Sequence, residues 1–585
     1  MQRNSVAPAW AGALVGLVSG GVALGVAQFV AAFVGPETFP VVAVGDVAVD
    51  LSPAPLKEFA IRAFGENDKT VLVGGVLVVL AAVAALIGTL ALRRLAYGLA
   101  GLAAFGAIGV VAVLTRPGAG VMDVLPTLLG VAAGAWTLSR LVRRATTGTG
   151  ASDAGYGVVA PASPSTSGAA ARGGDALGGD ARGGVAPGHA AQDGAATGAP
   201  PGDAAPGGSG VGGGAAVEWP AVMRAGDDLR AFDRRRLLTG AAGGVVVAGV
   251  AAVLGRQLGG RQVVDAARVG VALPKPVTPA KPVPAGADLH VNGLSSFITK
   301  NQDFYRVDTA LIVPQVDPRD WKLRIHGMVD RPVELTYADL LAMPLTEADV
   351  TLTCVSNEVG GEYVGNARWL GVRMAEVLRK AGLQSGADML LSTSADGFTC
   401  GTPVDVVMDG RDALFAVAMN GEALPVEHGF PVRQVVPGLY GYVSATKWVV
   451  DIKVTRFDRD QAYWTPRGWA AQGPIKTQSR IDVPKPGASV QPGRTTIAGV
   501  AWAQHTGVDA VEVRVDGAEW RQARLAEVPG PDTWRQWSID WDAAPGRHTI
   551  QVRATDAAGR TQTEQEAPPA PDGATGWHTI TVQVA

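Results

Sequence analysis

The residue in this sequence with the clearest capacity for metal chemistry is Cys354, one of only two cysteines in 585 residues. It follows an alternating apolar and polar run at residues 349–353 and precedes a glycine-containing segment at residues 355–361. This order predicts a thiolate at the end of a strand beside a loop, where a cysteine can reach a ligand. A lone cysteine is more often a small buried apolar residue, and a nucleophilic one needs a partner base that spacing does not identify. The residues alone leave these alternatives open.

The composition excludes several other kinds of site. Cys354 and Cys400 are too few for a disulfide framework or a four-ligand zinc or iron–sulfur centre, and Cys400 is expected to be buried structure. The seven histidines are scattered, without an HExxH spacing. Lys plus Arg number 50 against 53 Asp plus Glu, so no basic face for nucleic acid is indicated. No GxGxxG motif precedes a helix.

Several motifs accompany the cysteine segment in one order along residues 288–458. They are FITKN with FYR (297–306), TLTCVSN (351–357), ARWLGV (367–372), MNGEALP (419–425), HGFPVR (428–433) and SATKW (444–448). This ordered set resembles the molybdopterin-binding domain of the sulfite oxidase family. The resemblance implies a molybdenum–molybdopterin cofactor, Cys354 as the protein ligand to the metal, and oxygen-atom transfer. Soft sulfur donation suits an ion that changes oxidation state.

The resemblance also implies a set of cofactor-binding residues: Asn301, Tyr305, Arg306, Cys354, Ser394, His428, Arg433, Ser444, Thr446 and Lys447. The last four combine two cations with two hydroxyls, which suits the terminal phosphate of the cofactor. His428 and Asn301 are expected to hydrogen-bond the pterin. The catalytic candidates are Cys354, Arg306 and Trp369. Taken singly, each residue is more often structural, and the ordered set favours the functional interpretation.

The sequence departs from the family pattern near the metal ligand. Typical members carry a Cys-Ala-Gly-Asn-Arg-Arg run, whereas Asn357, Glu358 and Val359 stand where its last three residues fall. Val417 stands where they have a tyrosine. A pocket without those arginines does not offset the cost of desolvating an anion, so sulfite is not the expected substrate. The direction of oxygen transfer stays open.

The N-terminal part of the sequence indicates on which side of a membrane residues 288–458 lie. Five apolar stretches at residues 10–34, 71–92, 95–114, 121–138 and 237–255 are each close to the roughly 20 residues that span a bilayer. Arginines flank alternate ends of these stretches, which predicts an N-terminus inside and export of everything after the fifth span. The spans contain no histidine for a membrane haem and no mid-span charge, which favours an anchor over a transporter.

The domain plan follows from these patterns. Residues 1–144 form the transmembrane region, and residues 145–230 are a disordered Gly/Ala-rich cytoplasmic linker. Residues 231–256 carry Arg234–Arg236 before the fifth span, which fits a twin-arginine export signal or ordinary positive-inside flanking equally well. Residues 257–287 are a Pro-rich stalk, expected to be stiff and extended.

Two globular regions remain. Residues 288–458 are expected to be mixed α+β, with strands at 321–333, 349–354 and 389–394 and helices at 336–341 and 374–381. Residues 474–585 carry short alternating runs at 510–515, 537–541, 548–554 and 577–584, typical of an immunoglobulin-like β-sandwich. This sandwich resembles the family's dimerisation domain, which implies a homodimer.

The combined prediction is a multi-pass membrane protein with an extracytoplasmic α+β catalytic domain, a small-molecule substrate and a separate electron partner, either a cytochrome or a quinol system. Two alternatives come from other classes. One is an inactive binding or adhesion protein on the same fold. The other is a transporter or sensor whose exported domain is only a ligand-binding lid.

Overall fold

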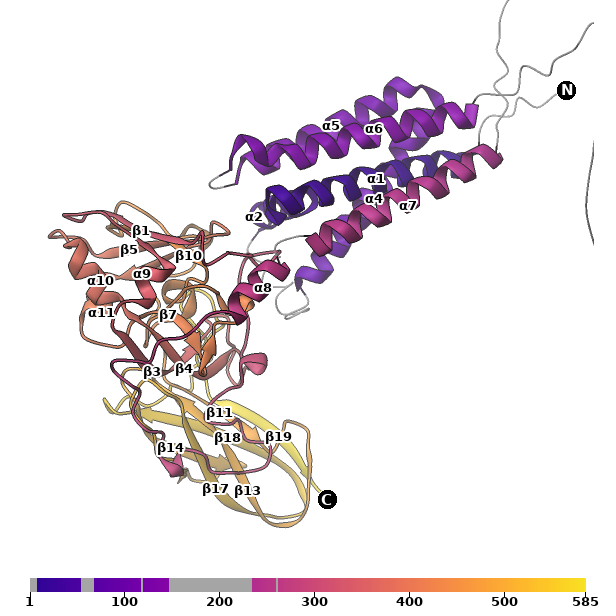
Figure 1. Ribbon diagram of the computed structural model, residues 1–585. Coiled ribbons are helices and arrows are strands. Elements are labelled where there is room, and N and C mark those ends of the chain that lie inside the picture. Colours follow the sequence, from indigo (N-terminus) through magenta and orange to yellow (C-terminus); the bar gives the residue numbers. More distant parts are fainter. Residues whose placement is uncertain (1–7, 54–67, 117–118, 147–233, 259–260) are drawn as a thin grey trace, which may run out of the picture. The chain divides into compact units, whose positions relative to one another are not determined.

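A computed structural model describes residues 8–53, 68–116, 119–146, 234–258 and 261–585 (Figure 1). The predicted linker at residues 145–230 lies outside the described residues, apart from the two residues that end a helix. The described chain has a helical N-terminal region, an α+β domain and a β-rich C-terminal domain.

The N-terminal region consists of long apolar helices. They are α1 (Ala9–Val34), α2 (Pro40–Leu51), α4 (Asp68–Arg93), α5 (Leu95–Leu114), α6 (Leu125–Thr146) and α7 (Arg234–Leu258). Within the described ranges, all of these except α2 are long and apolar enough to cross a membrane, and they coincide with the five predicted stretches. Helix α2 was not predicted. Glycines allow close packing here: a Cβ on Gly16 of α1 would lie 1.8 Å from the Ala84 carbonyl of α4.

The α+β domain contains two sheets. The first has the strand order β2-β1-β10-β5-β6 and is antiparallel except where β1 pairs with β10. Its strands are β1 (Lys322–Gly327), β2 (Val333–Thr336), β5 (Met389–Ser394), β6 (Thr399–Pro403) and β10 (Val449–Thr455). The second has the order β3-β4-β7-β8, with β9 also pairing with β7. Its strands are β3 (Leu345–Thr353), β4 (Val364–Arg373), β7 (Leu414–Met419), β8 (Glu422–Ala423) and β9 (Arg433–Val435).

Short helices pack on these sheets: α9 (Tyr337–Leu341), α10 (Met374–Ala381), α11 (Val404–Met408) and α12 (Gly441–Ser444). The boundaries of α10 and β5 match the prediction. Thr336 caps α9 as predicted: its Oγ1 accepts from the Asp339 N–H at 3.2 Å and the Asp339 carboxylate accepts from the Thr336 N–H at 2.9 Å.

The single strand predicted at residues 321–333 is wrong, because the segment forms the hairpin β1–β2. The break is at Gly327, whose φ is +92°. A Cβ there would lie 2.3 Å from the Val454 carbonyl, so only glycine lets the chain turn this close to β10.

The stiff, extended stalk predicted at residues 257–287 is also wrong in part. Residues 261–269 form helix α8 (Arg261–Val269), and Arg268 donates to the Leu424 carbonyl at 2.7 Å. The proline-rich part is extended, but it runs along β3. The Val277 N–H donates to the Leu345 carbonyl at 2.8 Å, and the Glu347 N–H donates to the Thr278 carbonyl at 2.8 Å. An edge strand needs partners for its outer backbone groups, and this segment supplies them to half of β3.

The C-terminal domain is a two-sheet sandwich, as predicted. One sheet has the order β11-β13-β17-β16 and the other β12-β19-β18-β14-β15. The long strands are β11 (Gln478–Val483), β13 (Gly493–Trp502), β14 (Val508–Val515), β17 (Arg535–Ala543), β18 (Gly546–Asp556) and β19 (His578–Val584). The short ones are β12 (Ser489–Val490), β15 (Arg521–Gln522) and β16 (Arg524–Leu525). Inward residues such as Trp537, Val511 and Ile580 fill the space between the sheets.

Candidate active site

Cys354 lies one residue beyond the end of β3, as predicted. Its N–H donates to the Tyr363 carbonyl at 2.9 Å, and its carbonyl accepts from the Asn357 N–H at 3.1 Å. The Asn357 side chain closes the loop by accepting from the Tyr363 N–H at 2.8 Å. The cysteine is only 9% exposed. Strand, turn and loop therefore hold the sulfur at one fixed place.

The surroundings of the Cys354 sulfur affect its ionisation in two opposite ways. Burial raises the pKa of the Cys354 thiol, while the Ser356 N–H, 3.4 Å from Sγ, and the Lys447 ammonium lower it. A thiol with a raised pKa stays protonated near neutral pH until a metal ion binds the sulfur and displaces the proton. Binding of a metal at Cys354 is therefore expected to release a proton.

Tyr305, which is partly exposed, and Arg433, which is buried, both lie near Cys354. Burial raises the pKa of the Tyr305 hydroxyl, the Cys354 thiolate raises it further, and the Arg433 guanidinium lowers it. The Tyr305 ring stacks on Phe304 with centroids 5.2 Å apart and lies 6.3 Å from the Tyr363 ring. The structure thus brings three of the predicted site residues together.

Arg433 is a buried cation that donates to backbone carbonyls. Its Nε donates to the Gln434 carbonyl at 3.3 Å and its Nη1 to the His428 carbonyl at 3.1 Å. Its Cζ lies 5.0 Å from the centre of the Trp369 ring. Among the described residues, no Asp or Glu lies within ion-pair distance of it, and burial lowers the pKa of Arg433 to about 10. Burying a charge this way is costly unless an anion joins it.

The other predicted phosphate contacts are placed differently. Lys447 Nζ pairs with the Asp308 carboxylate at 2.6 Å, and both side chains are buried. The Ser444 hydroxyl donates to the Tyr440 carbonyl at 2.9 Å within its own helix. The Thr446 hydroxyl is buried with no nitrogen or oxygen partner in the described chain, although it lies close enough to the Cys400 thiol to lower the pKa of that group. Arg433 and Thr446 therefore remain the best-placed donors for an anion, whereas Lys447 already has one.

His428 and Asn301 form one contact. His428 Nε2 lies 2.9 Å from the Asn301 carbonyl, which only accepts, so Nε2 carries the proton. Burial lowers the pKa of His428 to about 4, which makes the imidazole neutral with Nδ1 as an acceptor. The Asn301 side chain donates to Glu422 at 2.5 Å and accepts from Asn420 at 2.8 Å. Its amide ties the segment to the β7–β8 turn.

Four further residues singled out from sequence are in different surroundings. Arg306 is exposed, on the segment that carries Tyr305. Trp369 is fully buried beneath Arg433, and its Nε1 donates to the Val350 carbonyl at 3.1 Å. Ser394 is buried at the end of β5, and Val417 is fully buried in β7. The roles assigned to these residues stay predictions.

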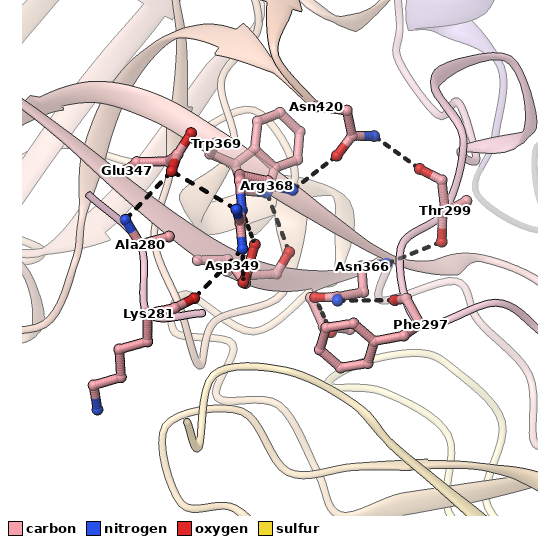
Figure 2. A network of polar contacts seen from close by, with 12 residues as sticks. Ala280, Lys281, Phe297, Thr299, Glu347, Asp349, Asn366, Arg368, Trp369 and Asn420 are labelled. Carbon is pink, nitrogen blue, oxygen red and sulfur yellow. Dashed lines mark hydrogen bonds and ion pairs between the residues drawn. The ribbon is translucent and has the colours of Figure 1, made fainter. Parts of the chain in front are cut away.

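A polar network that sequence reasoning missed attaches the Tyr305 segment to the sheet (Figure 2). The Asn420 side chain accepts from the Arg368 N–H at 2.9 Å and donates to the Thr299 carbonyl at 2.9 Å. Arg368 pairs with Asp349 on the neighbouring strand at 2.8 Å. The Asn420–Gly421 pair between β7 and β8 was readable as a tight turn, but its side-chain partners were not.

The residues present fit a molybdopterin. In the described part of the chain, no group of three or more His, Cys, Asp or Glu side chains could hold a metal, so a metal at Cys354 would take its remaining ligands from a cofactor. Among the described residues, no carboxylate pairs with Arg433, and Thr446 Oγ1 and Gln434 Oε1 are buried without a nitrogen or oxygen partner. An anionic group there would pair with Arg433 and accept from the Thr446 hydroxyl, whereas Gln434 Oε1 only accepts and would need a donor from the same cofactor.

Two parts of this chain are similar in sequence to known proteins. Residues 310–464 match the oxidoreductase molybdopterin binding domain, and residues 478–582 match a bacterial Ig domain. The chain is 34% identical over 157 residues to the uncharacterized oxidoreductase YuiH of Bacillus subtilis, covering 27% of this chain and 76% of that protein. It is 29% identical over 323 residues to sulfite oxidase of Gallus gallus, covering 46% of this chain and 69% of that one.

The chain belongs to the sulfite oxidase family. It is a molybdopterin-binding oxidoreductase with a C-terminal immunoglobulin-like domain, which confirms the family and enzyme class predicted from its motifs. The mitochondrial sulfite oxidase of Homo sapiens is 30% identical over 324 residues, 47% of this chain and 58% of that enzyme. The chain thus spans little more than half the length of that relative. The sulfane dehydrogenase SoxCD of Paracoccus pantotrophus aligns over 50% of this chain and 84% of its own, with 26% identity and a TM-score of 0.43.

Proposed function

We propose that this sulfite oxidase family member is a membrane-anchored molybdenum-cofactor oxidoreductase. It transfers an oxygen atom to or from a small extracytoplasmic substrate other than sulfite. The observation that supports this most directly is the grouping of Cys354, Tyr305 and Arg433 around one site, with a buried guanidinium that has no carboxylate partner in the described chain.

In this proposal the cofactor's metal is held by Cys354 and its anionic end by Arg433 and Thr446. When bound, the cofactor supplies a centre that exchanges an oxygen atom and two electrons with a substrate. The neutral His428 presents Nδ1 to a donor on the pterin, and Tyr305 closes one side of the pocket. The low exposure of Cys354 excludes water from the sulfur.

The loop after Cys354 argues for a neutral or cationic substrate. Residues 355–363 contain the carboxylates of Glu358 and Glu362 and no Lys or Arg. Arg480 donates to the Gly361 carbonyl at 2.9 Å, but its charge is paired with Asp482 at 2.7 Å. A dianion or monoanion would lose its hydration there with little compensation. A sulfoxide or a thioether meets no such penalty.

The helical region supports the proposed placement of the enzyme. Five described helices have the length and composition to cross a membrane, and the arginine pattern in the sequence supports a catalytic domain on the extracytoplasmic side. We further propose that electrons pass to or from a separate cytochrome or the quinol pool, and that two copies associate through the C-terminal domain.

The test is the molybdenum and pterin content of the full chain, purified in detergent from a host that makes the cofactor. We expect close to one molybdenum per chain. The Cys354→Ser variant should keep the pterin but lose the thiolate-to-metal absorption. Absence of both metal and pterin from folded protein would overturn the proposal and favour an inactive binding protein.

Substrate choice is tested on the same preparation. In single-turnover experiments that follow the metal's oxidation state, dimethyl sulfoxide is offered to protein reduced with dithionite, from which it takes two electrons. Sulfite is offered to oxidised protein, to which it gives two electrons. We expect turnover with the neutral compound and little with sulfite. Glu358→Arg should raise the rate with sulfite, and a fast sulfite reaction in the parent would contradict the substrate proposal.

A further inference from the structure

The strand that carries Cys354 has an outer edge with no neighbouring strand in its own sheet. β3 pairs with β4 on one side only. The proline-rich segment at Val277 and Thr278 covers the first half of the outer edge. The second half, nearest Cys354, is covered by the immunoglobulin-like domain.

Thr351 is the centre of this second contact. Its N–H donates to the Asp532 carbonyl at 2.9 Å, and its Oγ1 accepts from the Trp534 N–H at 2.7 Å. Its carbonyl accepts from Gln504 Nε2 at 3.1 Å. All three partners belong to the immunoglobulin-like domain, so this domain provides the hydrogen bonds that a neighbouring strand would otherwise supply.

Gln504 makes the contact closest to the metal ligand. Its Nε2 also donates to Thr353 Oγ1 at 2.9 Å, and Thr353 immediately precedes Cys354. The glutamine is 4% exposed, and its Oε1 is buried without a hydrogen-bond partner in the described chain. The amide therefore acts on β3 only through its two donated bonds.

The same domain holds the loop on the other side of Cys354. Arg480 donates to the Gly361 carbonyl, and the ring of His578 packs so tightly on Gly360 that a Cβ there would lie 2.2 Å from Cδ2. His578 is itself fixed, because its Nδ1 accepts from the Ile481 N–H at 2.9 Å. The strand before Cys354 and the loop after it are thus anchored on one rigid sandwich.

We propose that Gln504 is a positioning residue for Cys354: its amide completes the outer edge of β3 and fixes where the strand delivers the thiolate. The part of this inference that concerns the metal rests on the proposed function, whereas the position of the thiol does not. Gln504 acts through the backbone and the Thr353 side chain of β3, and it is not proposed to contact the reacting atoms.

The experiment compares Gln504→Met with Gln536→Met in the full chain. Gln536 is a matched control, since it lies in the same domain, is fully buried and also spans the two domains. It accepts from the Leu289 N–H at 2.7 Å and donates to the Ser295 carbonyl at 2.7 Å, away from β3. Methionine keeps the length of both side chains and removes their hydrogen bonds.

The first readout is the rate at which iodoacetamide alkylates Cys354 in cofactor-free protein, with the fully buried Cys400 as internal reference. Loss of two buried hydrogen bonds should raise this rate by roughly three- to tenfold in Gln504→Met and leave it unchanged in Gln536→Met. Thr353→Val, which removes one acceptor, should give an intermediate increase and serves if Gln504→Met does not fold.

The second readout is the Mo(V) electron paramagnetic resonance signal of loaded protein reduced with dithionite. It should shift or broaden in Gln504→Met and match the parent in Gln536→Met. An unchanged alkylation rate and signal in Gln504→Met, or equal changes in both variants, would overturn the proposal. Absence of molybdenum from the parent chain would overturn the proposed function. The alkylation rates, which are measured without cofactor, would still test whether Gln504 positions Cys354.

Discussion

The guanidinium of Arg433 stacks over the ring of Trp369, with Cζ 5.0 Å from the ring centre, in a place that solvent hardly reaches. A desolvated contact of this kind is worth about 2 kcal/mol. That is less than the cost of removing a cation from water, so the pair alone does not explain a charge at this site.

Replacing Arg433 with Met should therefore have opposite effects on two states of the protein. In the cofactor-free chain we expect the free energy of unfolding to stay the same or rise by about 1–2 kcal/mol, because an uncompensated buried charge is removed. In protein made with the cofactor we expect the pterin content to fall at least about tenfold, since one charge-assisted contact to phosphate is worth that much. Urea titration and pterin fluorescence measure the two effects.

Arg368→Met is the matched control for Arg433→Met. Arg368 is paired with Asp349 at 2.8 Å, so its loss leaves a buried carboxylate and should destabilise both states. If Arg433→Met destabilised the cofactor-free chain as much as Arg368→Met does, an unrecognised anion partner for Arg433 would be indicated.

His428 should make the catalytic domain less stable in acid. Its pKa is about 4 in the folded chain and near 6.5 when unfolded, so between these values only the unfolded chain takes up the proton. Stability is unaffected by this group above pH 6.5 and falls as the pH drops towards 4. At pH 4.5 the loss amounts to roughly 2 kcal/mol.

The measurement is the free energy of unfolding of the parent and of His428→Gln at pH 7.5 and pH 4.5. Glutamine can still donate to the Asn301 carbonyl but does not titrate. The difference between the two proteins should shrink at the lower pH. His578, whose pKa burial also lowers to about 4, is present in both and cancels. A difference that does not change with pH would show that His428 is charged in the folded chain.

Asn420 combines a backbone role and a side-chain role that substitutions can separate. Its φ is +52°, and Gly421 follows with +85°. Asn420→Gly keeps the turn and loses three hydrogen bonds, which should cost about 2–3 kcal/mol. Asn420→Ala adds backbone strain of about 1 kcal/mol. The urea midpoint is expected to be highest for the parent, lower for Asn420→Gly and lowest for Asn420→Ala. If Asn420→Gly were as stable as the parent, the side chain of Asn420 would make no contribution to stability.

The contact between Gly360 and His578 predicts a rescue. Gly360→Ala meets both a φ of +77° and the imidazole ring, so it should cost more than about 2 kcal/mol. Removing the ring with His578→Ala should recover at least about 1 kcal/mol of that cost in the double variant. Gly410→Ala is the control, since its φ is +102° with no atom within 4 Å of an added Cβ. It should be additive with His578→Ala.

Much of the fold could be predicted from patterns in short stretches of sequence. The helix α10, the strand β5 and the Thr336 cap depend on alternation, periodicity and one hydroxyl, all visible within ten residues. The same holds for the end of β3 at Cys354. The helices α2 and α8 were missed, since one lies between the first two apolar stretches and the other inside a segment classified by its prolines.

The contacts that complete the site could not be predicted, because they join distant parts of the chain. Asp308 pairs with Lys447 across 139 residues, and Gln504 reaches Thr351 across 153. Nothing in the sequence near either residue marks its partner. Motif order identified the region that matches the molybdopterin binding domain. Only the structure showed that Lys447 pairs with a carboxylate, whereas no carboxylate among the described residues pairs with Arg433.

The covered edge of β3 sets an order of events during biosynthesis. Thr351 leaves the ribosome 153 residues before Gln504 and 183 residues before Trp534. Until those residues emerge, the half of the strand edge beside Cys354 is open to pairing with other chains. The half of β3 beside Cys354 therefore has its edge covered only after the immunoglobulin-like domain has been made and folded. A chain truncated before that domain would keep every motif of residues 288–458 and leave this strand edge exposed.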